Sequence, residues 1–265
     1  MKDIHNFSPQ HKIEISEVGI QNYRIPLIFD MGHKISQRTV GEVSLAVNLS
    51  GQYRGVHMSR FVEIINKYSS QTLSVTILNK LAHELLKLVE ANNCAIRIKF
   101  PLFISRLSPI SQKKSPIDYQ CQLISSVLGG KDKVIHVLEV RIPISTVCPC
   151  SKLMSKYGAH NQRGFVTVIL KINDFTWIEK IIKLVEQEAS SPVYSLLKRA
   201  DEKYVTEKAY ENPKFVEDIV RDIASRLQSD KQINWIKIKC ENSESIHNHD
   251  VFACIERKNV HNIKS

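Results

Sequence analysis

The sequence predicts an α+β fold built from two similar halves. Runs of alternating apolar and polar residues, which are typical of strands, flank segments whose apolar residues have helical spacing, and this order occurs twice along the chain. The pair Gly129-Gly130 separates the two occurrences. Each half has the order β-β-α-α-β-β, with one extra helical piece in the second half, and a duplication explains both. Units of this kind form antiparallel sheets with helices on one face.

The first half begins with a polar stretch up to Asn22, which predicts an irregular N-terminal arm. Val43 and Leu45 belong to an alternating run that is typical of a strand, whereas Leu81 and Leu85 recur at helical spacing. The expected elements of this half are a strand at 42–55, helices at 58–68 and 72–92, and strands at 94–106 and 117–128.

The second half repeats this order. Val166 and Val168 lie in a run rich in β-forming residues, and Pro213 suits the first position of a helix. We therefore divide the chain into an arm at 1–22, a first unit at 23–130 and a second unit at 131–265. The expected elements of the second unit are strands at 133–147 and 164–173, helices at 176–189, from Pro192 and at 213–227, and strands at 233–240 and 250–257.

Composition narrows the class of protein. The chain has 265 residues, which suffices for one large domain or two of ordinary size. No stretch approaches the ~20 apolar residues needed to cross a bilayer, and the N-terminus lacks the apolar core of a signal peptide. Six scattered cysteines do not form a disulfide framework and suit a reducing compartment. We expect a cytoplasmic protein with no membrane partner.

The formal net charge of +10 favours anionic ligands. Lysines and acidic residues are nevertheless interspersed along the expected helices, as at 180–186, and there is no basic tail. A solvated surface of mixed charge is the simpler interpretation, so we expect no nucleic-acid partner.

A four-stranded sheet from either half would have open edges, which are prone to pair with other chains. We expect the sheets to close into barrels by association, so that the protein is a homo-oligomer. The alternative is a monomeric two-layer sandwich whose edge strands are covered by loops.

The densest group of reactive side chains lies at residues 148–164, between two expected strands. Cys148, Cys150 and His160 are the soft and borderline donors that bind divalent transition metals. The spacing of Cys148-Pro149-Cys150 differs from the Cys-x-x-Cys of structural zinc sites, and no second cysteine pair follows at zinc-ribbon spacing. Taken alone, the segment fits either a metal or nucleophile site or a pair of buried structural thiols.

Two acidic or histidine-rich clusters could add ligands. Asp201 and Glu202 fit a helix cap or a solvated turn, but Glu202 could also supply an oxygen ligand. The connection at 241–250 contains Glu244, His247 and His249. In an extended segment the two histidines would project to one face and could point at one ion, although surface histidines in polar loops are common.

A third cluster lies at 55–61, where a strand leads into a helix. Free N–H groups at a helix N-terminus, together with Ser59 and Arg60, would suit a phosphate. The alternative is an ordinary helix start with Ser59 as the N-cap.

Four stretches together resemble the GTP cyclohydrolase IB family; they are 54–61, 148–152, 157–164 and 244–250. The resemblance implies the tunnelling fold, in which tandem β-β-α-α-β-β units assemble into barrels with active sites at subunit interfaces. It also implies conversion of GTP and water to 7,8-dihydroneopterin triphosphate and formate, the first step of tetrahydrofolate synthesis and, in many bacteria, of queuosine synthesis. A homotetramer is expected.

The resemblance also implies roles for residues, most of which lie in the second unit. Cys148, His247 and Glu244 are the expected catalytic groups, with Glu244 or a histidine of its loop moving protons. One divalent ion per site, Zn²⁺ or Mn²⁺ with Fe²⁺ as a further candidate, is expected to lower the pKa of water. The expected metal ligands are Cys148, His160, Glu202 and His247, and the expected substrate-binding residues are Glu217 for guanine and Arg60, Lys152, Arg163 and His57.

Four protein ligands would leave no vertex for water in a tetrahedral zinc site. Either the coordination expands to five, or His160 moves between ligand and supporting roles, and we take Cys148, Glu202 and His247 as the core set. Two other functions stay open at this point. One is the archaeal type of cyclohydrolase, which leaves a cyclic phosphate on its product. The other is a non-enzymatic basic module that binds RNA or a nucleotide, with a structural zinc held by Cys148 and Cys150.

Overall fold

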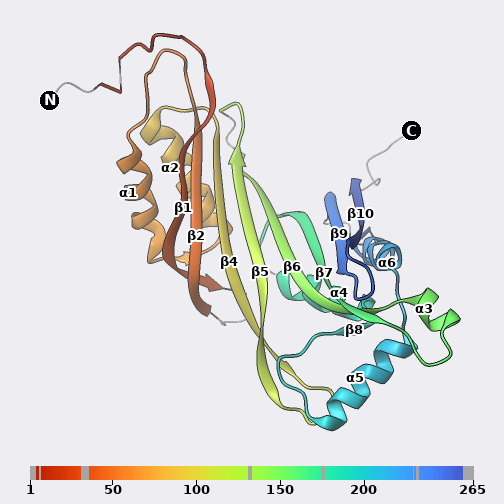
Figure 1. Ribbon diagram of the computed structural model, residues 1–265. Coiled ribbons are helices and arrows are strands. Elements are labelled where there is room, and N and C mark those ends of the chain that lie inside the picture. Colours follow the sequence, from red (N-terminus) through yellow and green to blue (C-terminus); the bar gives the residue numbers. More distant parts are fainter. Residues whose placement is uncertain are drawn as a thin grey trace. The chain divides into compact units, whose positions relative to one another are not determined.

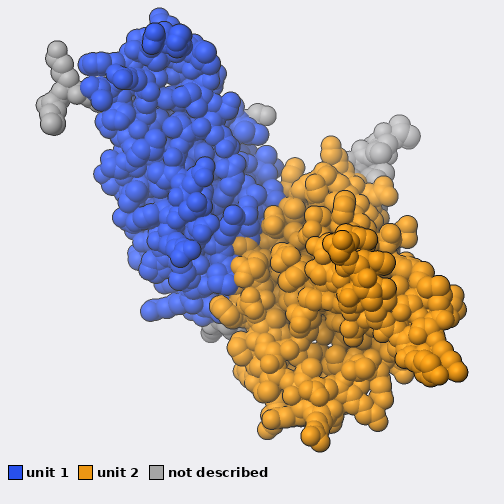
Figure 2. Space-filling model, viewed as in Figure 1, with its two compact units in different colours: residues 1–101, 122–138, 172–176 blue, residues 102–121, 139–171, 177–265 orange. Residues whose placement is uncertain are grey.

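The structure is a computed structural model, which describes residues 4–5, 7–30, 36–130, 133–174, 177–228, 230 and 233–258 (Figure 1). The chain forms an α+β protein with long antiparallel strands. It divides into two compact units, shown in blue and orange in Figure 2, and four of the long strands contribute residues to both. No helix among the described residues is long and apolar enough to cross a membrane.

The first unit comprises residues 1–101, 122–138 and 172–176. Its elements are β1 (Ile15–Asp30), β2 (Ser36–Leu49), α1 (Met58–Ser69), β3 (Thr72–Leu73), α2 (Val75–Val89) and parts of β4 (Cys94–Leu107), β5 (Lys114–Val127) and β6 (Ile135–Val147). Its sheet is antiparallel where β1 pairs with β2 and β2 with β4, and the short β3 pairs parallel to β1. Helices α1 and α2 lie against one face of this sheet (Figure 1).

The core of the first unit follows from two periodicities. From Gly41 onwards every second residue of β2, such as Val43 and Leu45, is buried, and so are Leu78 and Leu85 on one side of α2. A strand has a side-chain period of two and a helix one of 3.6, so these residues face each other across the layer boundary. Burial of this apolar face fixes the helices on the sheet.

The second unit comprises residues 102–121, 139–171 and 177–265. Its further elements are α3 (Pro149–Met154), β7 (Asn161–Ile172), α4 (Trp177–Glu188), β8 (Ser191–Pro192), α5 (Arg199–Glu211), α6 (Val216–Gln228), β9 (Trp235–Ser243) and β10 (Asp250–Lys258). The last residue of β7, Ile172, belongs to the first unit. Strand β9 pairs antiparallel with both β7 and β10, and β8 pairs with β6. Val168 and Ile238 of the sheet and Ile182 and Ile223 of the helices are fully buried, so α4 and α6 pack by the same rule.

The predicted order of elements is confirmed in both halves, with the extra helix in the second. Several boundaries were wrong. Strand β1 begins at Ile15, inside the predicted arm, and α5 begins at Arg199 rather than at Pro192, which instead pairs with β6. Helix α6 begins at Val216, three residues after Pro213, and the short helix α3 was missed. The domain boundary at 130 stays a prediction, because the compact units interleave along the chain.

Candidate functional site

One pocket in the second unit collects much of the chemistry that the sequence suggested. It is a cavity of about 260 Å³ at the ends of β6 and β9 and the starts of β7 and α6. A thiol, imidazoles and carboxylates meet in it. The residues that line it are Cys148, His160, Gln162, Lys214, Phe215, Val216, Glu217, Asn242, Glu244, His247, His249 and Val251.

Cys148 is held at the N-terminus of α3. Pro149 occupies the first helical position, where its missing N–H costs nothing, and the Ser151 N–H donates to the Cys148 Sγ at 3.4 Å. The Cys148 N–H donates to the His160 carbonyl at 3.2 Å. The local backbone therefore brings the thiol and the imidazole to the same rim of the pocket.

Cys148 is the one cysteine that lines this pocket. Burial raises the pKa of Cys94 to about 11 and those of Cys121 and Cys240 to about 12, so these three thiols stay protonated at neutral pH. Cys148 is half-buried and Cys150 is exposed. The alternative of a buried structural pair at 148 and 150 is therefore excluded.

The register of β7 and β9 explains why Gln162 meets Glu244. Gly164 lies opposite Asn242 in this antiparallel pair, so residues two positions further out on each strand also face each other. Strand alternation puts Gln162 and the preceding His160 on the same face as Gly164. Gln162 is almost fully buried at 8% exposure, which makes its hydrogen bonds costly to lose.

Gln162 connects His160 to Glu244. Its Nε2 donates to Glu244 Oε1 at 3.1 Å, and its Oε1 lies 3.0 Å from His160 Nδ1. The Ser245 hydroxyl is a further, longer contact of the same ring nitrogen, at 3.3 Å, and the His160 N–H donates to Ser151 Oγ at 3.1 Å. The imidazole therefore has a defined orientation on the β7 side of the pocket.

His247 and His249 reach the pocket from the loop between β9 and β10. The sequence predicted an extended segment, but residues 245–249 form bends. The two rings stack, with centroids 5.1 Å apart and an interplanar angle of 22°. Both side chains are exposed. Among the described residues, no three His, Cys, Asp or Glu side chains stand close enough together to hold a metal ion.

Glu217 lies in the first turn of α6. Its side chain is exposed in the pocket, and no hydrogen bond or ion pair within the described part of the chain engages its carboxylate. Its neighbour Lys214 forms an ion pair with Asp222. The helix start is fixed separately by the Phe215 N–H, which donates to Asp218 Oδ2 at 3.1 Å. A carboxylate is thus presented to the cavity with its acceptor atoms available.

Other predicted site residues do not line this pocket. Glu202 is exposed on α5, and Lys152 donates to the Tyr210 carbonyl and lies over its ring at 4.5 Å. Arg163 is exposed and, by strand alternation, points away from the face of Gln162. Their roles at the site stay predictions.

His57 and Arg60 line another pocket, of about 210 Å³, in the first unit. Arg60 Nη1 donates to the Leu88 carbonyl at 2.9 Å. The N-cap of α1 is His57, without a side-chain capping bond, so the interpretation of Ser59 as the N-cap was wrong.

Asp201, the neighbour of Glu202, has a structural role. Its fully buried carboxylate accepts hydrogen bonds from the N–H groups of Ile110, Ser111 and Lys198, each at 2.8 Å, and from Ser111 Oγ at 2.6 Å. Burial alone would raise the pKa of Asp201, but these hydrogen bonds hold it well below its ordinary value. The carboxylate therefore ties the start of α5 to the turn between β4 and β5.

Asn242 was not anticipated from the sequence. It is 2% exposed and its Nδ2 donates to Thr146 Oγ1 at 3.0 Å, which connects β9 to β6. The side chain passes Gly164 of the intervening β7, where the methyl group of an alanine would come within 2.2 Å of Asn242 Oδ1. Absence of a side chain at 164 is therefore what lets Asn242 span β7 at the edge of the pocket.

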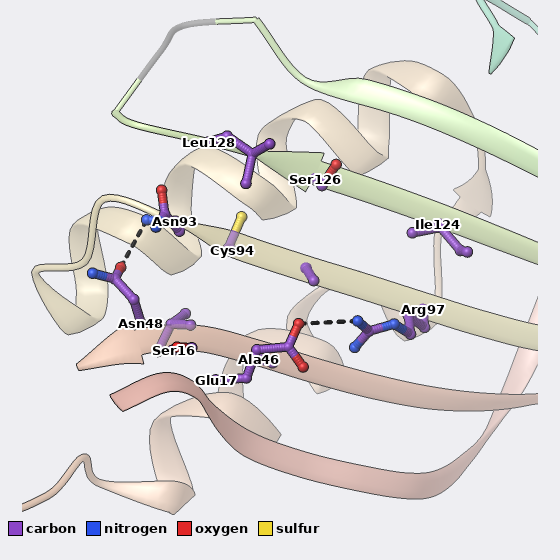
Figure 3. A pocket seen from close by; sticks show the side chains of 12 residues that line it. Ser16, Glu17, Ala46, Asn48, Asn93, Cys94, Arg97, Ile124, Ser126 and Leu128 are labelled. Carbon is purple, nitrogen blue, oxygen red and sulfur yellow. Dashed lines mark hydrogen bonds and ion pairs between the residues drawn. The ribbon is translucent and has the colours of Figure 1, made fainter. Parts of the chain in front are cut away.

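A larger cavity, of about 370 Å³, lies in the first unit (Figure 3). Its charged residues pair with each other, and Asn48 accepts a backbone hydrogen bond. Arg97 Nη2 lies 3.0 Å from Glu17 Oε1, and the Asn93 N–H donates to Asn48 Oδ1 at 2.8 Å. Its one cysteine, Cys94, is buried. The pocket of the second unit is thus the better candidate for chemistry.

The fold is shared with urate oxidases of solved structure. The uricase from Arthrobacter globiformis matches 92% of this chain and 93% of its own, with a TM-score of 0.58 and 7% identity. The urate oxidase from Bacillus sp. TB-90 matches 92% of this chain and 99% of its own, with a TM-score of 0.51 and 9% identity. At such identities the likeness shows the fold alone. The protein is a tunnelling-fold protein whose second unit presents a thiol, imidazoles and carboxylates in one pocket.

Sequence relatives identify the family. The family model described as type I GTP cyclohydrolase folE2 matches residues 1–253. The GTP cyclohydrolase FolE2 of Thermotoga maritima is 43% identical over 258 residues, which cover 97% of both chains. That of Syntrophobacter fumaroxidans is 43% identical over 258 residues, which cover 97% of this chain and 99% of the relative. The chain belongs to the type I GTP cyclohydrolase folE2 family, and this name replaces the IB resemblance noted from the motifs.

Proposed function

We propose that this GTP cyclohydrolase of the FolE2 family converts GTP and water to 7,8-dihydroneopterin triphosphate and formate in the pocket of the second unit. The observation that carries the proposal is the convergence of Cys148, His160, His247, Glu244 and Glu217 on one cavity from four separate stretches of the chain. The product is the one that opens tetrahydrofolate synthesis. Supply of queuosine synthesis is a further use of the same product.

Glu217 is proposed to bind the guanine edge. A carboxylate has acceptor atoms only, and guanine offers two adjacent donors, its N1–H and its 2-amino group. The exposed Glu217 at the start of α6 can accept from both. Adenine presents an acceptor at N1, so the same carboxylate selects against it.

Glu244 is proposed to move protons during ring opening. Water must add at C8 of guanine, after which the bond between C8 and N9 breaks and the formyl group is hydrolysed from N7. Each step transfers a proton between an oxygen and a nitrogen of the original imidazole ring. Glu244 accepts one hydrogen bond from Gln162, which fixes one carboxylate oxygen and leaves the other for this task.

The donor set of the pocket fits a divalent transition metal. Cys148, His160 and His247 provide one sulfur and two nitrogen donors, which suit Zn²⁺, Fe²⁺ or Mn²⁺ in that order of softness. These three residues are proposed as ligands, with Glu202 as the fourth candidate. A bound divalent ion would supply a water molecule with a pKa of about 7. The donors are not gathered into a ligating cluster within the described part of the chain, so we propose that these side chains move when the ion binds.

A second copy of the chain is proposed to complete the site. The cavity, at about 260 Å³, falls below the ~300–1,000 Å³ typical of sites for drug-sized ligands, so it suits the base better than a whole nucleoside triphosphate. His57 and Arg60 line another pocket, in the first unit, and we propose that they contact the triphosphate in the assembly. We propose a homotetramer of barrels with sites at subunit interfaces, with Lys152 and Arg163 as further phosphate-binding residues.

Two finer points belong to the same proposal. A cytoplasmic location is proposed, since all six cysteines lie in the described part of the chain and are free thiols, which suits a reducing compartment. The product is proposed to be the linear triphosphate rather than the cyclic phosphate of the archaeal type. Mass analysis of the product formed from GTP separates these two outcomes.

The test is a metal-dependent assay with GTP. Protein treated with a chelator should stay folded and release no formate, and added Mn²⁺ or Zn²⁺ should restore release of formate and formation of a fluorescent pterin after oxidation. Cys148→Ala should abolish turnover, whereas Cys150→Ala should reduce it less. Equal, wild-type-like activity of both variants would remove the thiol from the mechanism. Unfolding on chelation, with no turnover, would instead favour a structural zinc.

A further inference from the structure

We infer that Gln162 is a positioning residue that decides which nitrogen His160 offers to a metal ion and that holds Glu244 beside it. The inference rests on the proposed function for its importance, but its structural basis lies in the hydrogen bonds of Gln162 alone. Gln162 lies in the stretch 157–164 that carries the family resemblance, but that resemblance assigned it no role. Its buried neutral side chain lies between His160, a proposed metal ligand, and Glu244, the proposed proton carrier.

The orientation of the Gln162 amide is fixed by Glu244. An ionised carboxylate can only accept hydrogen bonds, so the amide nitrogen of Gln162 must face it, as it does at 3.1 Å. The amide oxygen then faces His160 Nδ1 at 3.0 Å. The reversed amide would set an oxygen against a carboxylate oxygen and is therefore excluded.

The amide oxygen in turn fixes the tautomer of His160. Gln162 Oε1 has no hydrogen to donate, so His160 Nδ1 must carry the proton and donate it. The hydroxyl of Ser245, at 3.3 Å, can accept from the same N–H and so does not oppose this assignment. In the neutral ring the lone pair is then on Nε2, which becomes the nitrogen available to a metal.

Burial makes both hydrogen bonds of the Gln162 side chain costly to lose. Gln162 is 8% exposed, so water offers little replacement for either hydrogen bond. Loss of the amide would leave the Nδ1–H of His160 with only the longer contact to Ser245, and would free the Glu244 carboxylate to turn. A single side chain, that of Gln162, thus positions both His160, a proposed metal ligand, and Glu244, the proposed proton carrier.

The first experiment reads the tautomer directly. Long-range ¹H–¹⁵N correlation spectra of the metal-free protein at pH 8 should show His160 as the Nδ1–H form. In Gln162→Leu, which cannot accept a hydrogen bond, His160 should shift towards the Nε2–H form. This measurement needs neither metal nor turnover. An Nε2–H form of His160 in the wild type, or an unchanged Nδ1–H form in Gln162→Leu, would overturn the inference.

The second experiment measures binding of Zn²⁺ and Co²⁺ by competition with a chromophoric chelator. Loss of a partner of a metal-ligating histidine typically costs 10–100-fold in affinity, and we expect this loss in Gln162→Leu. Gln162→Glu keeps an acceptor for His160 but sets two carboxylates together, so metal affinity should stay within threefold while turnover falls. Gln187→Leu, on an exposed position of α4, is the matched control and should change neither.

These outcomes separate the inference from the proposed function. Failure of the wild type to bind metal or to convert GTP would contradict the function, while the His160 tautomer would still decide the role of Gln162. If the wild type and a folded Gln162→Leu variant bind metal and convert GTP equally well, the inference is overturned and the proposed function stands. If Gln162→Leu does not fold, Gln162→Glu is the decisive variant. It should keep its metal affinity and lose turnover, and equal losses of metal affinity and turnover would contradict the inference.

Discussion

Replacement of Glu217 by glutamine tests the proposed binding of guanine by this residue with almost no change in side-chain shape. The wild-type carboxylate, exposed at the start of α6, would accept two hydrogen bonds from guanine. A hydrogen bond to a charged group contributes about 1.5–3 kcal/mol, and a neutral one about 0.5–1.5 kcal/mol. The glutamine keeps one neutral acceptor and turns an N–H₂ group towards a donor. The net loss is therefore about 2–4 kcal/mol, or about 30- to 1,000-fold in kcat/KM.

The assay is initial-rate formate release with GTP and with ITP, which lacks the 2-amino group. If the carboxylate binds base equally in the ground and transition states, the loss should appear in KM. The wild type should discriminate against ITP, and Glu217→Gln should discriminate less. Folding should change little, since the side chain has no hydrogen-bond or ion-pair partner among the described residues and a first-turn acid contributes only about 0.3–1 kcal/mol.

The matched control is Glu207→Gln, the same chemical change on an exposed position of α5 outside the pocket. It should leave both substrates unaffected. A Glu217→Gln enzyme with kcat/KM for GTP within threefold of wild type, and with unchanged preference over ITP, would refute the assignment of Glu217 to the base.

Three further predictions concern stability. Gly164→Ala should lower the free energy of unfolding by about 1–3 kcal/mol through the clash with Asn242, and in a double-mutant cycle with Asn242→Ala the two effects should be less than additive. Burial lowers the pKa of His136 below 6.5, so on acidification the unfolded chain binds a proton at this residue before the folded chain does. The free energy of unfolding should therefore fall as the pH drops below about 6.5, and in urea titrations His136→Gln should weaken this dependence on pH. Asp201→Asn removes an acceptor from a buried carboxylate and should lower Tm more than Glu202→Gln does. An equal effect of the two would contradict the role of Asp201 in tying α5 to the turn between β4 and β5.

Elements with a strong periodic signal were predicted well. Helix α1 was expected at 58–68 and spans Met58–Ser69, and β10 was expected at 250–257 and spans Asp250–Lys258. Buried apolar residues recur at helical spacing along α1, and partly buried residues alternate with exposed ones over most of β10. Helix α5 lacks that signal because only Asp201 and Ala209 are buried along it. Its start depends on a long-range clamp to residues 110 and 111, which no local pattern reveals.

Strand β1 belongs to the predicted order, but no residue range was assigned to it, for a related reason. Its pairing with β2 is interrupted by register shifts between Ile15 and Val18 and between Ile20 and Tyr23, and Asn22 has a φ of 58°. These irregularities break the alternation by which a strand is recognised. Helix α3 has six residues, too few for a helical period to appear in the sequence.

The site was predicted where donor chemistry is visible in the residue types themselves. Cys148, His160 and His247 could be singled out as donors, and all three line the pocket. Gln162 and Asn242 could not, because a glutamine or an asparagine has no distinctive chemistry until the register of β7 and β9 is known. The spacing of His160 and Gln162 was the one usable signal, since alternate residues of a strand share a face.

The passage of Asn242 over Gly164 to Thr146 has a consequence for how this sequence can change over time. Asn242, Gly164 and Thr146, on three adjacent strands, depend on one another. Asn242 can donate to the Thr146 hydroxyl only while position 164 carries no side chain. Libraries that randomise one of these sites should return mostly the native residue. Libraries that randomise all three together could return new triplets, and the pocket rim would be reshaped by such coordinated replacements rather than by single steps.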